Sequence, residues 1–220
     1  MTIPQSSATS RTIAPPPPPP PRAPTIHKLL MVAWLALLLG MAMETLLLAV
    51  AAGFRAATAP DPFLADLAQK LSWSFLVCLG LAVGSAVERA RPVAMGILGF
   101  LCAPLAFNVA RAFHKGLAGA LGVTVAAGPA PFAVAALKAT QYALLGFVLG
   151  HIGQRGWGAL AHVGAGLAAG LLFGIPIAAL TMAEGAPPAV AAARAVNELA
   201  FPVGCSLVLY TAEILSQRRA

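Results

Sequence analysis

Four ionisable side chains lie inside or at the edge of long apolar stretches of the sequence: Glu44, Lys70, Lys138 and Glu198. A charged side chain near the centre of a lipid bilayer costs roughly 2.5–3.5 kcal/mol on insertion scales, so such groups turn toward other protein groups and pair with them. Acids and lysines placed in this way are groups that can bind a solute or exchange a proton. The sequence therefore predicts a polar centre built from these four residues.

The depth of these residues along their apolar stretches predicts which of them meet. Glu44 follows Lys28 by sixteen residues, which at 1.5 Å per residue is roughly 24 Å. Lys70 opens a stretch that enters from the opposite side, so we expect it to pair with Glu44 in the outer third of the layer. By the same reasoning, Glu198 pairs with Lys138. The alternatives are that the lysines snorkel to the lipid headgroups and that Glu198 lies at the interface beside Arg194.

Composition identifies the apolar stretches as membrane helices. Hydrophobic residues make up 59% of the chain and charged residues only 10%, whereas soluble domains have roughly 45–50% and about 25%. A water-soluble fold could not bury so much apolar surface, so the lipid bilayer must cover it. We expect an all-α integral membrane protein, because helices satisfy their own backbone groups within lipid.

Six stretches are long enough to cross a bilayer, which takes about 20 apolar residues. We expect crossings at 29–53, 71–87, 92–110, 132–151, 159–181 and 192–215. The second has only 17 residues, so it must be extended by residues 64–69 or cross a thinned bilayer. The stretch 116–131 is rich in Gly and Pro. We interpret it as an outer loop or a re-entrant segment, with a seventh span as the alternative.

The chain divides into a short tail and a membrane domain. Residues 1–26 include seven consecutive prolines and lack core-forming side chains, so we expect a disordered cytoplasmic tail. Residues 27–217 form the polytopic membrane domain. Basic residues, Lys28 and Arg91 among them, are slightly more frequent on the side that carries both termini, which the positive-inside rule places in the cytoplasm. Ten arginines against four lysines and a high alanine content indicate a bacterial inner-membrane protein.

Two stretches share a spacing of glycine and charge. Residues 80–92 and 146–158 each contain Gly-x3-Gly, followed four residues later by Glu-Arg or Gln-Arg. This predicts a parallel repeat of two helical hairpins, crossings 2–3 and 4–5, as occurs in transporters. Small residues at this spacing also let helix backbones touch. We expect helix packing, within the chain or between subunits, at Gly80, Gly84, Gly146, Gly150, Gly166, Gly170 and Gly174.

The other polar residues indicate no catalytic or metal site. The sequence has no H-E-x-x-H, G-x-S-x-G or P-loop motif, so we expect no enzyme activity, no metal and no cofactor. Cys78, Cys102 and Cys205 are an odd number of thiols and are expected to pack as small hydrophobic side chains. The net charge of +7 is carried by scattered residues rather than a basic block, so a nucleic-acid partner is not expected.

Two functions are compatible with these features. The first is a small permease or channel-like transporter, whose polar centre in the outer leaflet binds a solute or a proton. The second is a non-catalytic membrane subunit or scaffold, whose Gly-rich helix faces pack against other subunits or a second copy. Transporter sites lie near the bilayer midplane, and the four ionisable residues lie higher than that, which weakens the first. Transport is nevertheless the more specific prediction.

Overall fold

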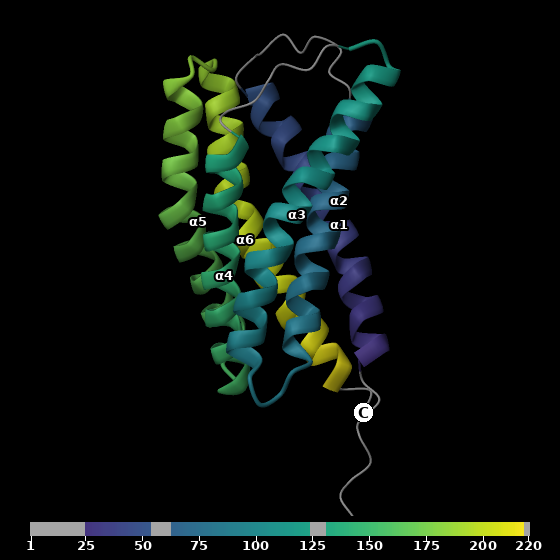
Figure 1. Ribbon diagram of the computed structural model, residues 1–220, viewed down its shortest axis with the longest axis vertical. Coiled ribbons are helices and arrows are strands. Elements are labelled where there is room, and N and C mark those ends of the chain that lie inside the picture. Colours follow the sequence, from purple (N-terminus) through teal and green to yellow (C-terminus); the bar gives the residue numbers. More distant parts are fainter. Residues whose placement is uncertain (1–24, 54–62, 124–130, 218–220) are drawn as a thin grey trace, which may run out of the picture.

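Six long helices make up the part of the chain that the computed structural model describes, residues 25–53, 63–123 and 131–217 (Figure 1). Each described helix is long and apolar enough to span a membrane, so the predicted all-α membrane fold is confirmed. The helices are α1 (Thr25–Gly53), α2 (Phe63–Ser85), α3 (Arg91–Ala120), α4 (Pro131–Gln154), α5 (Ala159–Ala183) and α6 (Pro188–Gln217).

Successive helices run in opposite directions, so the first residues of α1 and the last of α6 lie at the same end of the bundle (Figure 1). The short α2–α3 and α4–α5 turns lie there too. We call this the terminal end and the other the opposite end. Each helix contacts its neighbours in the sequence, and α1 contacts α6, which closes the ring of helices. Helix α6 also reaches α2 and α4 across the ring.

Helices α2 and α6 begin earlier than the apolar stretches indicated. Helix α2 starts at Phe63 instead of residue 71, so residues 64–69 extend the short second crossing. Helix α6 starts at Pro188, a residue whose fixed φ suits the first turn of a helix. Helix α1 starts at Thr25, and residues 1–24 of the predicted tail lie outside the described residues.

Helix α3 is longer than expected and corrects the interpretation of residues 116–131. It runs to Ala120, so residues 116–120 are helical and the prediction of a loop was wrong for them. Glycine is common in membrane helices and does not end one by itself. The chain turns only at Gly122, which has a positive φ of 73°. Residues 124–130 lie outside the described part of the chain.

The seven glycines assigned to packing lie at contacts within this chain. On α2 and α4, Gly84 and Gly150 approach α3 so closely that an added Cβ would lie 2.7 Å from Met95 Cα and 2.5 Å from Pro92 Cα. On α5, a Cβ at Gly166 would lie 2.6 Å from Val203 Cα of α6. Gly80 and Gly146 likewise face α3, and Gly170 and Gly174 face α6. The helices approach one another closely at these positions, as small residues permit.

The packing of the two hairpins is not the same. Gly80 and Gly84 face α3, the partner of α2 in its own hairpin. Gly146 and Gly150, at the matching positions of α4, also face α3 and not α5. The two glycine pairs therefore converge on one helix from both sides. The duplication of the hairpin stays a prediction from the sequence.

Large apolar side chains cover the outside of the bundle. On α3 and α5, Phe100, Leu101, Leu172 and Ile175 are each more than half exposed, at 51% to 64%. A surface of this kind is stable only against lipid or another protein. Membrane-spanning helices with such a surface contact the bilayer.

Candidate functional site

The centre of the candidate site is an ion pair between Lys138 of α4 and Glu198 of α6. Lys138 Nζ donates a hydrogen bond to Glu198 Oε2, and the two residues are only 3% and 1% exposed. The structure thus brings together one of the two pairs that the sequence predicted. For Lys138 the snorkelling alternative was wrong, because its ammonium group lies inside the bundle and not at the headgroups.

Aromatic rings surround the Lys138 ammonium on one side. Its Nζ lies 5.3 Å from the ring centroid of Trp73 and 5.9 Å from that of Tyr142, distances at which the negative face of a ring attracts a cation. Trp73, Tyr142 and Phe201 also meet one another edge to face, with centroids 5.8–6.4 Å apart. Each ring belongs to a residue three or four positions after Lys70, Lys138 or Glu198, so the rings form a layer between the ion pair and the terminal end.

Arg194 extends the pair toward the opposite end of the bundle. Its Nε lies 3.3 Å from Glu198 Oε1, one helical turn away on the same helix. The Arg194 side chain is 31% exposed, so this cation lies between the buried pair and the surface. Glu198 therefore has a cation on each of its two oxygens.

The other predicted pair, Glu44 and Lys70, joins the same centre. Glu44 is 5% exposed, so its carboxylate lies inside the bundle and does not face lipid. Lys70, which is half-buried, interacts electrostatically with Glu44 and Asp66 and also with Arg194 and Glu198. Ionic contacts join Lys138, Glu198 and Arg194, and Lys70 lies within electrostatic range of Glu198 and Arg194 and of Glu44 and Asp66. We call this group of charges the buried centre.

Several polar atoms next to the ion pair have unused hydrogen-bonding capacity. Gln141 Nε2 donates to the Ala169 carbonyl oxygen at 3.3 Å, which fixes the orientation of the amide. Gln141 Oε1 and Asn197 Oδ1 are buried and accept no hydrogen bond from the described residues, and Glu198 Oε1 has only its ionic contact with Arg194. Buried polar atoms are nearly always satisfied by protein or by ordered water. Such atoms can accept a hydrogen bond from a water molecule or a solute.

A second ion cluster lies at the terminal end, and sequence reasoning missed it. Glu213 Oε2 accepts hydrogen bonds from Lys28 Nζ and from Arg91 Nη2, both at 2.7 Å, and Glu213 Oε1 accepts one from Arg91 Nη1 at 3.2 Å. Lys28 and Arg91 were interpreted only as charges that set orientation. The available signal was Glu213 itself, an acid four residues before the end of α6 and at the level of both cations.

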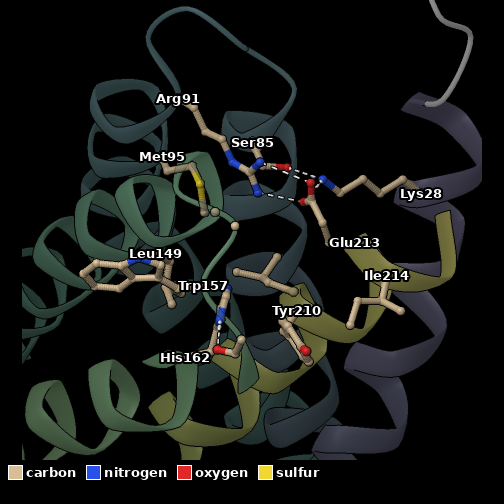
Figure 2. Close-up of a pocket in the computed structure, with 14 residues that line it drawn as sticks. Lys28, Ser85, Arg91, Met95, Leu149, Trp157, His162, Tyr210, Glu213 and Ile214 are labelled. Atoms are coloured by element: carbon tan, nitrogen blue, oxygen red, sulfur yellow. Dashed lines mark hydrogen bonds and ion pairs between the residues drawn. The ribbon is translucent and has the colours of Figure 1, made fainter. Parts of the chain in front are cut away.

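A cavity of about 180 Å³ lies beside this terminal cluster. Figure 2 shows Lys28 and Arg91 meeting Glu213 on one side of the cavity, with His162 and Tyr210 on the other. The His162 ring is buried, its Nδ1 lies 3.1 Å from the Gly158 carbonyl oxygen, and its centroid is 4.9 Å from that of Tyr210. Residues from all six helices line this space.

Comparisons with protein families, with curated proteins and with solved structures found no match. The function must therefore be argued from the chemistry of the two clusters. The buried centre can attract a proton or another hydrogen-bond donor, because it combines a carboxylate with open acceptor atoms. The terminal cluster offers the reverse, a surplus of cationic donors beside a cavity.

Proposed function

We propose that the protein is a small permease or channel-like transporter whose buried centre binds a proton or a small solute. The observation that supports this proposal is the Lys138–Glu198 pair, two ionisable residues 3% and 1% exposed within membrane-spanning helices. Such residues are costly in a membrane and typically mark the pathways of ions, protons or substrates. No enzymatic step is part of the proposal.

The open atoms of the buried centre favour a solute that donates hydrogen bonds. Gln141 Oε1, Asn197 Oδ1 and Glu198 Oε1 are acceptors, and the Tyr142 hydroxyl and Arg194 Nε are donors that also lack a hydrogen bond among the described residues. A proton, an ammonium ion or a water molecule supplies the hydrogen bonds that the three acceptors lack, whereas an anion would be repelled by these three atoms. Lys70, Lys138 and Arg194 are balanced by Glu44, Asp66 and Glu198, so the centre as a whole has no excess positive charge for an anion.

The surroundings of the centre suggest from which side a solute enters. Arg194 and Asn197 lie between Glu198 and the start of α6, and both are only partly buried. Toward the terminal end, Trp73, Tyr142 and Phe201 block the way. Access is therefore from the opposite end, and passage requires the aromatic rings to move.

We further propose that the protein lies in the inner membrane of a bacterium with its terminal end in the cytoplasm, because basic residues are slightly more frequent on the side that carries both termini. In this orientation the buried centre lies in the outer leaflet. The alternative function is a non-catalytic subunit or scaffold. It requires Gly-rich helix faces that are free to pack against another protein. Since all seven glycines contact helices of this chain, they offer no such face to another protein.

Flux into proteoliposomes tests the proposal. The purified full chain is reconstituted into vesicles that contain a pH-sensitive dye, with the membrane potential clamped, and a gradient of protons or of methylammonium is imposed. We expect flux above that of empty vesicles. The double variant Lys138→Met/Glu198→Leu keeps the side-chain volumes similar and removes both buried charges together. It is expected to fold, and its flux should be at least about tenfold lower than that of the unchanged chain.

The matched control removes one lysine and one glutamate that are exposed, Lys115 and Glu184. Lys115→Met/Glu184→Leu is expected to keep the flux of the unchanged chain. The proposal fails if the unchanged chain carries neither protons nor methylammonium, or if the buried double variant carries them equally well. Purification with a stoichiometric partner and no flux would favour the subunit alternative.

A further inference from the structure

We propose that the cavity at the terminal end is a binding site for a phosphate group, held by Lys28 and Arg91. The site lies on the other side of the aromatic layer from the buried centre, and the inference does not depend on transport. It rests on the charge, the unused donors and the space around this cavity.

The cavity carries a net positive charge. The charged residues among those that line it are Lys28, Arg91 and Glu213, so two cations share one carboxylate. Arg155 stacks over Trp157, another lining residue, with its Cζ 5.4 Å from the ring centroid. A second negative charge is needed to balance the cations, and an anionic ligand supplies it.

The two cations have donors to spare. A guanidinium group has five N–H donors, and the hydrogen bonds of Arg91 among the described residues are the two to Glu213. Arg91 Nε is buried and has no partner there. Lys28 Nζ donates one hydrogen bond to Glu213 and another to Ser85 Oγ at 3.0 Å, and these two bonds position its ammonium group. Phosphate oxygens are strong acceptors and match such a donor set.

The cavity has the space and the backbone for such a ligand. Its volume of about 180 Å³ is many times the roughly 10–15 Å³ needed to hold one water molecule. Arg91 is the first residue of α3, and the N-terminal end of a helix carries positive potential. Gly153 leaves room for the guanidinium, because an added Cβ would lie 2.6 Å from Arg91 Nη2. Gly156, in the adjoining turn, has a positive φ of 66°.

Phosphate can reach this site from two sources. Lys28 is only three residues from the start of α1, and Glu213 is four from the end of α6, so the cavity lies at the level of lipid headgroups. Trp157, which is 49% exposed, and Ile214 supply apolar surface at the same cavity. A phospholipid headgroup and a soluble phosphate compound therefore share the chemistry that the site recognises.

Binding measurements on the purified full chain test the inference. Inorganic phosphate is titrated by calorimetry in a non-ionic detergent, and phosphatidylglycerol is tested by native mass spectrometry against a phosphate-free glycolipid. We expect saturable binding of at least one of these phosphate probes. Arg91→Gln should weaken it at least about tenfold, because this substitution removes the charged fork that phosphate prefers. Arg91→Lys keeps the charge and should weaken it less.

Arg89→Gln is the matched control, since Arg89 is exposed and lies two residues from Arg91; it should bind as the unchanged chain does. Arg91-dependent binding of inorganic phosphate identifies a soluble source, and Arg91-dependent retention of phosphatidylglycerol alone identifies a lipid. Binding of neither probe, or binding that a folded Arg91→Gln variant retains in full, would overturn the inference. The Lys138→Met/Glu198→Leu variant should still bind phosphate, so failure of the transport proposal is distinguishable from failure of this one.

Discussion

The two ion clusters use the same side-chain chemistry in opposite surroundings. Helix α6 supplies one carboxylate to each, Glu198 and Glu213, fifteen residues apart, which is roughly 22 Å along a helix. Glu198 is 1% exposed and lies behind a layer of aromatic rings, whereas the side chain of Glu213 is 26% exposed and borders a cavity. Each carboxylate meets two cations, one of them a lysine and the other an arginine.

This difference in burial sets how each cluster responds to change. A buried pair is stable only as a pair, because removing one partner leaves a charge that neither water nor protein solvates. A partly exposed cluster loses less stability when one partner is removed, because water replaces the missing partner. The buried centre should therefore be sensitive to single substitutions, and the terminal cluster should be sensitive to the solution around it.

The largest expected effect is the loss of one partner of the buried pair. Glu198→Gln leaves the Lys138 ammonium without its carboxylate and should lower the free energy of unfolding by about 3–5 kcal/mol. The double variant Lys138→Met/Glu198→Leu should recover most of that loss. Unfolding in mixed micelles, followed by circular dichroism during titration with a denaturing detergent, measures both.

Glu184→Gln is the control for this comparison, because Glu184 is exposed at the end of α5; its effect should be within about 0.5 kcal/mol. Equal stability of Glu198→Gln and the unchanged chain would mean that the pair is not desolvated. The two clusters would then not differ in how far they are removed from water.

Glycines beside the two clusters give an intermediate effect. A Cβ at Gly174 would lie 2.9 Å from Glu198 Cβ, an atom that cannot move without the backbone of α6. The Cβ of Gly153→Ala would meet the Arg91 guanidinium, the flexible end of a side chain. Gly174→Ala should cost about 1–3 kcal/mol by overpacking, and Gly153→Ala less than about 1. The same unfolding titration compares them, and a larger cost for Gly153→Ala would contradict the prediction.

Some of this structure could be predicted from the sequence because lipid imposes simple rules. Apolar length gave the number of helices, and the cost of a charge in hydrocarbon gave the inward orientation of Glu44 and the pairing of Lys138 with Glu198. These arguments need only the position of each residue along its own helix, and the pairing follows when two such positions lie at the same depth. Helix ends were less predictable: α3 continues through Gly116 and Gly119, where composition alone indicated a break.

The terminal cluster could not be predicted by the same rules. Lys28, Arg91 and Glu213 come from three helices and lie near helix ends, where a charge has little cost and needs no partner. Their convergence depends on how α1, α3 and α6 approach one another, which is set by tertiary packing. The cavity is likewise formed by residues of all six helices, and no local pattern marks it.

The smallest expected effect is a difference between the two clusters in how the cost of a substitution depends on salt concentration. Glu213→Gln should cost about 1 kcal/mol at low ionic strength, because its partners are partly exposed. Between about 0.05 and 0.5 M salt this cost should fall by roughly half as the charges are screened. The cost of Glu198→Gln should change much less over the same range, because salt screens a buried pair much less than an exposed one. Each cost is the difference from the unchanged chain at the same salt, which cancels any effect of salt on the micelle. Equal salt dependence at both positions would mean that the surroundings of Glu198 are as open to solvent as those of Glu213, and the buried centre would then be a second surface cluster.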